Sequence, residues 1–317
     1  MNVSIVIVNY NGKDLLRALL KSISGSSYRN YEIIIVDNNS TDGSREFIKK
    51  NYKNVKLIEN KKNLGYSGIN SALKYCKGTY ILFLNNDMEL DKDCIENLVK
   101  ALKSNKDAVM TTPRLINFYN RNLKSNGTWV SRAFYNGHIK GDNKNHIKEI
   151  PYLGVGLIKK EFVEMFGYLF DPDYFIYAED VDLGLRIRLI GKKTLFQPKA
   201  IIYHMHSVTM QKSKNSFATF LMERNLLTTF FKILSVKNIV LFLPYVFFAR
   251  FVAIVRDISN FKFVIALSRL RTILWILINF NVIIRKRQQV QKFRTIDDSY
   301  ILKVFSEKYL LKPKIII

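Results

Sequence analysis

Two clusters of carboxylate and amide side chains in this chain are suited to chemistry on a phosphorylated substrate. The first is Glu179-Asp180-Val181-Asp182, which places three carboxylates within four positions directly after a run of aromatic residues. The second is Asn85-Asn86-Asp87, which closes an apolar run with the pattern of a buried strand. Carboxylates at strand ends bind metals and substrates in α/β proteins. One cluster suited to a divalent cation and one suited to proton abstraction indicate group transfer from a phosphorylated donor.

The segments that must position these clusters have the pattern of alternating strands and helices. Continuous apolar runs, rich in β-branched and aromatic residues, predict strands covered on both faces, at residues 3–8, 33–36, 55–58 and 80–84. Helical patterns lie between and after them, at residues 15–23, 46–48, 69–76 and 92–104. Residues 40–42 are expected to cap the second helix, and Asp91 the last. This alternation predicts a parallel sheet with right-handed crossovers.

The remainder of the chain is less regular and then becomes helical. Residues 111–152 are polar and rich in Asn, Gly and Lys, which predicts irregular strands and loops that shape an acceptor cleft. A helical face returns at residues 179–190 and ends at Gly191. The apolar runs 238–255 and 261–284 are interrupted by charged residues and a proline. They favour helices lying in the plane of a membrane surface, with a true span or hairpin left open.

Charge is concentrated in the second part of the chain. Residues 1–182 carry 26 Lys and Arg against 21 Asp and Glu, whereas residues 183–317 carry 24 against 5. Nearly all of the net charge of +24 therefore lies in the segment that is also rich in apolar residues. This combination favours an anionic lipid surface and argues against a uniformly basic nucleic-acid binder.

Cysteine usage and the N-terminus indicate the compartment. Cys76 and Cys94 make no disulfide framework, which predicts a reduced, cytoplasmic environment. The chain runs directly into a strand pattern, without the basic and apolar regions of a signal peptide. We therefore expect a cytoplasmic protein that is peripheral at the inner face of the cell membrane.

Single strand-end motifs leave alternatives open. Tyr10 could stack on a base or simply belong to a strand-to-helix turn. Asp37 ends a buried run, where an unpaired carboxylate would be costly, so a hydrogen bond to a base or ribose is favoured. The glycines of residues 63–70 precede a helix and either admit a ligand or form a tight turn. Asp87 suffices for Mg²⁺ or Mn²⁺ if a diphosphate supplies further ligands.

The histidines are expected to play different parts. His204 and His206 lie two positions apart on an expected strand and so face one side, which favours a metal or phosphate contact, with simple packing as the alternative. His138 and His146 lie in polar loop sequence and are expected at the surface.

Together these motifs resemble the family 2 glycosyltransferases of the GT-A fold, most closely the rhamnosyltransferase-like branch. The matching segments are residues 4–12, 36–44, 63–70, 82–87, 154–156, 167–171 and 175–186, followed by His204, Arg224 and Asn225. The resemblance implies an α/β fold with a Rossmann-like, mostly parallel sheet flanked by helices. Residues 1–225 are then the catalytic domain, and residues 226–317 a basic, apolar helical extension that associates with a membrane.

The resemblance also implies roles for individual residues in an inverting transfer from a nucleotide-diphospho-sugar. Asp180 takes the position of the general base, and its neighbours Glu179 and Asp182 would raise its pKa by like-charge repulsion. Asp182 could instead pair with Arg186. Asp87 and His204 are expected at a bound Mg²⁺ or Mn²⁺. The residues expected to bind the donor are Asn9, Tyr10, Asp37, Asn39, Asn63, Gly65, Gly68, Asn70, Asn86, Gly154, Gly156 and Glu179.

Substrates and competing functions follow from the same motifs. The expected acceptor is a lipid-linked or growing cell-surface glycan, and dTDP-rhamnose is the favoured donor, with glucose, galactose, galactofuranose and N-acetylhexosamine donors open. No nucleic-acid partner is expected, and the C-terminal helices could instead form a homodimer. The alternative is a catalytically inactive module that binds anionic membranes or nucleic acid, against which the set Asp37, Asp87 and Asp180 argues. A nucleotidyltransferase is disfavoured because no Gly-rich basic loop follows the first strand.

Overall fold

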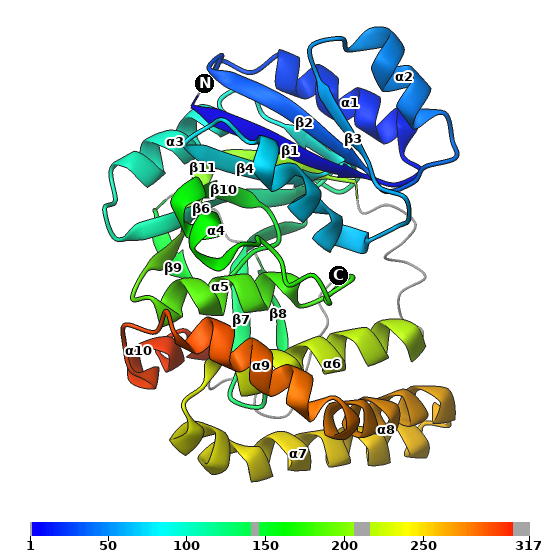
Figure 1. Ribbon diagram of the computed structural model, residues 1–317, viewed down its shortest axis with the longest axis vertical. Coiled ribbons are helices and arrows are strands. Elements are labelled where there is room, and N and C mark those ends of the chain that lie inside the picture. The colour runs from blue at the N-terminus through cyan, green and yellow to red at the C-terminus, as the bar shows by residue number, and fades with distance from the viewer. Residues whose placement is uncertain (1, 141–145, 206–215, 307–317) are drawn as a thin grey trace.

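The computed structural model describes residues 2–140, 146–205 and 216–306. Strands and helices alternate through the first hundred residues, as the apolar runs predict (Figure 1). The strands are β1 (Val3–Asn9), β2 (Tyr31–Asp37), β3 (Lys56–Glu59) and β4 (Tyr80–Asn85). The helices are α1 (Lys13–Ser24), α2 (Ser44–Asn51), the 3₁₀ helix η1 (Gly65–Tyr75) and α3 (Cys94–Lys103).

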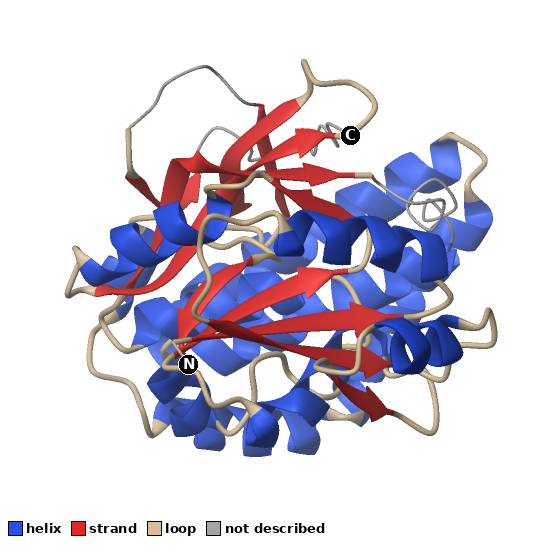
Figure 2. Ribbon diagram, turned by 90° about the horizontal axis from the view of Figure 1, so that it is seen from above, coloured by secondary structure: helices blue, strands red, loops and turns tan. Residues whose placement is uncertain are grey.

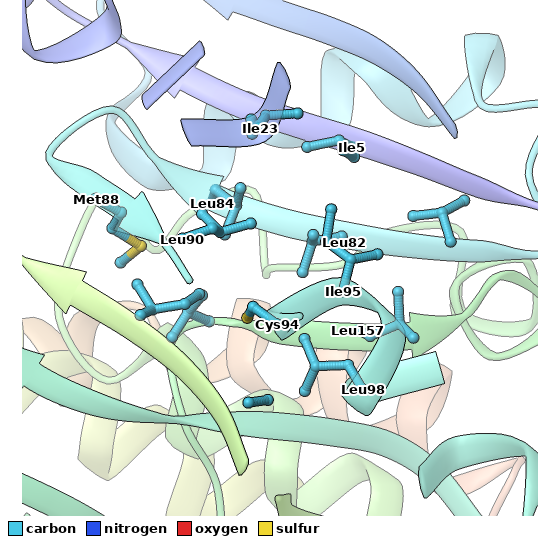
Figure 3. Close-up of a cluster of buried hydrophobic side chains, with 14 of the residues drawn as sticks. Ile5, Ile23, Leu82, Leu84, Met88, Leu90, Cys94, Ile95, Leu98 and Leu157 are labelled. Carbon is cyan, nitrogen blue, oxygen red and sulfur yellow. The ribbon is translucent and has the colours of Figure 1, made fainter. Parts of the chain in front are cut away.

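These four strands form a parallel sheet in which β1 and β4 are buried on both faces, whereas the edge strand β3, also expected to be covered, is only partly buried. β1 lies between β2 and β4, and β3 pairs with the outer edge of β2. Ile5 and Ile7 of β1 pack on one side with leucines of α1 and α3. Figure 3 shows part of this cluster, including Ile5, Ile23 of α1 and Leu98 of α3. Val6 and Val8 pack on the other side with η1. Burial of both faces explains why these strands are continuous apolar runs rather than alternating ones.

The second half of the sheet is mixed. Its strands are β5 (Met88–Leu90), β6 (Ala108–Asn117), β7 (Lys124–Ser131), β8 (Asn136–Lys140), β9 (Lys148–Ile150), β10 (Gly156–Lys159), β11 (Lys193–His204) and β12 (Phe305–Ser306). The main order is β12-β7-β6-β10-β4-β1-β2-β3, and β10 runs antiparallel to β4 and β6. Residues 111–152, expected to be irregular, therefore contain regular strands. The reason is non-local pairing, since β6 pairs with β11 more than eighty residues later.

The remaining helices include the acidic cluster and the C-terminal region. They are α4 (Lys160–Phe166), α5 (Glu179–Leu189), α6 (Ser216–Ile233), α7 (Val236–Ser259), α8 (Phe263–Ile278), α9 (Phe280–Gln291) and α10 (Asp298–Leu302). α6 to α9 gather at the end of the molecule away from α1 and α2 (Figure 1). Figure 2, seen from above, shows helices both in front of the strands and behind them. Residue 225, the expected end of the catalytic domain, lies inside α6.

Two expected helix caps are wrong in detail. α2 begins at Ser44 after Gly43, and Asp42 accepts a hydrogen bond from the Ser44 amide at 3.1 Å. The Ser40 hydroxyl instead accepts a hydrogen bond from the amide of Asn11 at 2.9 Å. The helix expected from residue 92 begins at Cys94, and its N-cap residue is Asp93 rather than Asp91. Close spacing of polar residues before a helix does not determine which of them caps it.

Candidate active site

The parallel register brings the polar residues at the ends of β1, β2 and β4 to one edge of the sheet. Asn9 at the end of β1 is opposite Asp37 at the end of β2, and its neighbour Val8 is opposite Asn85 at the end of β4. Asn86 and Asp87 follow in the turn between β4 and β5. The carboxyl ends of parallel strands are where open α/β sheets bind ligands, so this edge defines the candidate site.

Asp37 is held by the protein itself. The Nδ2 atom of Asn9 donates to Asp37 Oδ2 at 3.0 Å, and the Ser40 amide donates to Asp37 Oδ1 at 2.8 Å. The side chain is completely buried, and Arg45 Nε lies 4.0 Å from Oδ1. In this structure the carboxylate stabilises the turn after β2. A contact between Asp37 and a nucleotide base stays a prediction.

The side chains of Asn9 and Asn86 hydrogen-bond to each other and so connect the end of β1 to the turn after β4. Asn86 Nδ2 donates to Asn9 Oδ1 at 2.8 Å. Sequence reasoning missed the part of Gly12, where a Cβ atom would lie only 2.0 Å from Asn86 Nδ2, so glycine is required for this pairing. Tyr10 and Asn39, by contrast, are exposed at the same edge, where a nucleotide could reach them.

The segment 63–70 packs against the rest of the chain, and the expectation that its residues meet the donor stays a prediction. Asn63 accepts from the Gly65 amide at 2.8 Å, which forms a local turn. A Cβ at Gly65 would lie 1.9 Å from the Phe175 carbonyl oxygen, and one at Gly68 would lie 2.5 Å from Asn38 Oδ1. The protein itself therefore takes the space that these glycines leave.

Asn70 and Gly156 also make close contacts within the protein, and their contact with the donor stays a prediction. Asn70 Nδ2 donates to the Phe170 carbonyl at 2.7 Å, and its Oδ1 accepts from the Leu169 amide at 2.9 Å. Both ends of this side chain are therefore engaged in holding the segment before α5. A Cβ at Gly156 would lie 2.6 Å from the Thr111 carbonyl oxygen, so its glycine is explained by strand packing.

The acid pair begins α5 and faces Gly154. A Cβ at Gly154 would lie 3.4 Å from Asp180 Oδ2, which places this backbone beside the expected base. Asp180 is partly exposed, and its Oδ1 accepts from the Val181 amide at 2.9 Å. Glu179 is buried, and its Oε2 has no hydrogen-bond partner among the described residues. Of the two carboxylates, Asp180 is the one that a substrate can reach.

Burial raises the pKa of both Glu179 and Asp180 above the ordinary range of a carboxyl group. The charge of Asp180 adds to the effect on Glu179. The predicted direction is confirmed for Asp180, but its main cause is desolvation rather than repulsion. The expected contribution of Asp182 is wrong, because Asp182 is fully buried against Arg186 at 2.8 Å and Lys232 at 2.6 Å. Its charge is neutralised there, and it serves the packing of α5.

Tyr66 connects the two clusters, and sequence reasoning did not single it out. Its hydroxyl donates to the Gly154 carbonyl oxygen at 2.8 Å. Burial raises its pKa well above the ordinary value, and the charges of Glu179, Asp180 and Asp87 raise it further. All three carboxylates therefore lie within electrostatic reach of one phenol. An aromatic residue directly after the glycine of the 63–70 motif was the available signal.

His204 meets Asp87 because β5 pairs antiparallel with β11, which places His204 opposite Met88. His204 Nε2 lies 3.2 Å from Asp87 Oδ2. Within residues 2–140, 146–205 and 216–306, no group of three or more His, Cys, Asp or Glu residues could hold a metal ion. One carboxylate and one imidazole fit a Mg²⁺ or Mn²⁺ ion only when substrate phosphates complete its shell. His206 lies outside the described residues. His146 is exposed, as predicted, whereas His138 is exposed but lies in β8 rather than in a loop.

A parallel α/β sheet with a carboxylate-lined edge, opposed by an acid-bearing helix, defines the GT-A class of nucleotide-diphospho-sugar transferases. Residues 4–164, half of the chain, match the family model described as glycosyl transferase family 2, and the chain belongs to this family. Solved structures share the fold. GalNAc-T7 with UDP, GalNAc and Mn²⁺ aligns with a TM-score of 0.56 and 20% identity, over 64% of this chain and 43% of that one. S. aureus TarS 1-349 with UDP aligns with a TM-score of 0.53 and 16% identity, and the alignment covers 74% of this chain and 66% of that one.

Two curated relatives align with the N-terminal part. The poly(ribitol-phosphate) beta-glucosyltransferase of Bacillus spizizenii is 37% identical over 116 residues, which cover 34% of this chain and 18% of the relative. The UDP-Glc:alpha-D-GlcNAc-diphosphoundecaprenol beta-1,3-glucosyltransferase WfaP of Escherichia coli is 39% identical over 107 residues, 33% of this chain and 42% of the relative. Each alignment thus spans less than half of the relative's length.

Proposed function

We propose that this protein is an inverting glycosyltransferase that moves a sugar from a nucleotide-diphospho-sugar to a hydroxyl group of a lipid-linked or growing cell-surface glycan. The observation that carries the proposal is that Glu179 and Asp180 on one side, and Asp87 on the other, lie near the same residue, Tyr66. The acid pair of Glu179 and Asp180 suits proton transfer, and the pair of Asp87 and His204 suits a diphosphate-bound cation. The relatives' names, which include poly(ribitol-phosphate) and diphosphoundecaprenol, support this class of acceptor.

In this proposal Asp180 accepts the proton of the acceptor hydroxyl while that oxygen bonds to the anomeric carbon of the donor. The bond from this carbon to the diphosphate breaks on the opposite face, so the configuration inverts and the electron pair leaves with the nucleotide. Asp87 and His204 would hold a Mg²⁺ or Mn²⁺ ion, which would supply positive charge to the leaving diphosphate. Glu179, whose raised pKa favours the protonated form, is buried beside Asp180, and its contact with the donor stays a prediction.

The metal assignment is tested with Asp87→Ala. We expect this variant to lose transfer together with any response to added Mn²⁺, because the diphosphate loses its charge clamp. Asp107→Asn, a change at an exposed carboxylate, is the matched control and should behave as the unmodified protein. Full transfer by the unmodified protein in EDTA would refute metal dependence.

The donor is identified by a screen of nucleotide sugars. The sequence resemblance favours dTDP-rhamnose, whereas the relatives' names carry glucose, so dTDP-rhamnose and UDP-glucose are the first two compounds to compare. A ligand at 100 times its Kd stabilises the folded protein by about 2.7 kcal/mol, which a thermal melt detects. Each stabilising donor is then incubated with Mn²⁺ to measure its hydrolysis. An inactive binding module would hydrolyse none of them.

The outer surface of α7 and α8 supports a peripheral membrane location. Their exposed apolar side chains include Val240, Leu241, Phe248, Phe251, Leu267, Leu270, Leu274 and Leu277. Exposed apolar surface of this extent marks an interaction site. The net charge of +19 over residues 183–317 favours an anionic lipid surface as the partner. A homodimer through the same helices is the competing arrangement.

The inner surface of α7 supports an in-plane orientation. By length and composition α7 could cross a membrane, and α8 with α9 only across a 70° bend. Arg250, however, is buried with its Nε 3.0 Å from Glu223 of α6, and its Nη1 donates to the Ala133 carbonyl oxygen at 2.8 Å. Asp257 of the same helix pairs with Arg269 of α8 at 2.8 Å. A spanning α7 would lose these partners and move charges into lipid, so we propose that it lies on the bilayer surface.

A further inference from the structure

The two residues directly before the acid pair have a backbone conformation that side chains rarely adopt. Tyr177 has a φ of +72° and Ala178 a φ of +58°. Ala178 is also the N-cap residue of α5, so this pair sets the direction in which Glu179 and Asp180 leave the turn. Left-handed conformations at two successive non-glycine residues persist only where the surroundings hold them.

Asn225 of α6 holds this turn from the opposite side. Its side-chain Nδ2 donates to the carbonyl oxygen of Ile176 at 3.1 Å and to that of Tyr177 at 2.7 Å. Its Oδ1 accepts from Arg224 Nε at 2.9 Å, which sets the way the amide faces. Asn225 is completely buried. A buried amide is costly unless its hydrogen bonds are made, and this one makes them to the strained segment.

Neighbouring groups fasten the same segment to α6. The Tyr174 hydroxyl donates to the Asn225 carbonyl oxygen at 3.0 Å, and Arg224 Nη2 donates to the Asp173 carbonyl oxygen at 2.8 Å. Among the described residues, the side-chain hydrogen bonds of Asn225 go to the segment before the acid pair and to Arg224, and none goes to Glu179 or Asp180. Asn225 therefore has the geometry of a group that acts through the turn.

We propose that Asn225 is a positioning residue for the transfer reaction, which it serves by holding Tyr177 and Ala178 in the conformation that aims Asp180. This proposal rests on the proposed function of Asp180 as the base. It makes α6, which packs against α8 and α9, a part of the catalytic centre as well as of the C-terminal region. Misplacing a reacting group by about 1 Å can slow a reaction by about 10²-fold.

The test compares the unmodified protein with two variants, Asn225→Ala and Asn225→Asp. Asn225→Asp keeps the shape of the side chain but removes the two N–H donors of Nδ2. We expect kcat to fall by about 10-fold to 100-fold while the KM for the donor stays within about threefold. Thr228→Val is the matched control, since Thr228 is buried in the same helix and its hydroxyl has no hydrogen-bond partner among the described residues. It should keep normal kcat. Melting temperature is measured for every variant so that only folded protein is compared.

A glycine at position 178 separates positioning from general destabilisation. Glycine adopts positive φ without a Cβ clash, so Ala178→Gly should raise the kcat of Asn225→Ala several-fold and not that of the unmodified protein. A mere loss of packing predicts no such rescue, and its absence would overturn the proposal, as would a normal kcat in folded Asn225→Ala. Asp180→Asn is assayed alongside. If Asp180→Asn stays active, the base assignment fails; if it is inactive while Asn225→Ala is normal, only the positioning role fails.

Discussion

Glu179 and Asp180 are neighbours in the chain, yet their side chains meet different surroundings. Glu179 turns into the protein and is only 7% exposed, whereas Asp180 is partly open beside Gly154. Both carboxyl groups have a raised pKa because burial disfavours the charged form. Carboxyl groups whose surroundings raise the pKa are suited to proton transfer near neutral pH, and of these two only Asp180 is accessible.

At the residue scale, Asp180→Asn tests the base. We expect transfer to fall by about 10² to 10⁴ because no group then accepts the acceptor's proton. Donor binding, measured by calorimetric titration, should stay within a few-fold, since the amide keeps the shape of the side chain. Asp107→Asn controls for loss of a negative charge elsewhere. Near-normal turnover in Asp180→Asn would assign the base to another residue.

The pH dependence of the reaction follows from the same pKa shift. The base must be ionised to act, so kcat/KM should rise with pH through the raised pKa of Asp180. The midpoint of this acidic limb is expected above the ordinary Asp value of about 3.9. A profile from pH 4.5 to 8.5, recorded where the protein remains folded, measures it. A rate that is flat down to pH 4.5 would contradict a raised pKa.

At the scale of elements, α6 connects the acid-bearing helix to the C-terminal region through buried charges. Lys232 of α6 is completely buried and lies 2.7 Å from Asp171 and 2.6 Å from Asp182. Lys286 of α9 pairs with Asp171 as well. Burial by itself raises the pKa of Asp171, but the two lysines outweigh it, and the net shift is downward. The helix that carries Asp180 is therefore bound to α6 through the ion pair between Asp182 and Lys232.

Lys232→Met should destabilise the protein strongly. Methionine fills similar space but leaves Asp182 and Asp171 without the Lys232 charge, and breaking a buried ion pair typically costs about 3–5 kcal/mol. Urea denaturation at pH 7 measures the loss in the free energy of unfolding. Lys100→Met, at an exposed lysine of α3, is the control and should change stability by less than about 1 kcal/mol. An equally small change in Lys232→Met would show that the buried pairs contribute little.

The effect of Lys232→Met should also depend on pH. A carboxyl group with a depressed pKa contributes stability above its unfolded pKa, and this contribution is lost as pH falls through the folded value. For Asp171 the contribution is present at neutral pH and declines below about pH 4. The difference in stability between the unmodified protein and Lys232→Met should therefore shrink on acidification. A constant difference down to pH 3 would mean that Lys232 acts through packing alone.

At the scale of the whole molecule, the catalytic edge and the apolar helices are parts of one body. α6 contributes Asn225 and Lys232 to the surroundings of α5 and also packs against α8 and α9. A truncation after residue 225 would cut α6 and remove Lys232, so it cannot separate membrane binding from catalysis. Substitutions on the exposed surface of α7 test the membrane location without that damage.

We expect the protein to sediment with anionic vesicles and to bind less at high salt. Each Lys or Arg near such a surface contributes roughly 1 kcal/mol, which salt screens, and inserted apolar side chains add a part that salt does not reduce. The variant Leu241→Gln, Phe248→Gln and Phe251→Gln should bind vesicles weakly while keeping donor hydrolysis. Neutral vesicles are the control. If the unmodified protein stays soluble with anionic vesicles at low salt and forms dimers, the apolar surface is a subunit interface.

The sequence by itself determined the first four strands and the edge of the sheet at which the candidate site lies. Continuous apolar runs predicted β1 to β4, and because parallel strands end at one edge, Asn9, Asp37 and Asp87 had to gather there. The resemblance assigned Asp180 and His204 to the same place. These inferences rest on local patterns and on topology, which a single chain displays directly.

Only the tertiary structure decided which motif residues are accessible at the candidate site and which make contacts within the protein. Asn70 is engaged by a segment a hundred residues away, and Asp182 is neutralised by Lys232, fifty residues later. The strained turn before Asp180 and its bonds to Asn225 also have no local signature. Each depends on a contact between distant parts of the chain, and local patterns of residue type do not specify which distant groups will meet.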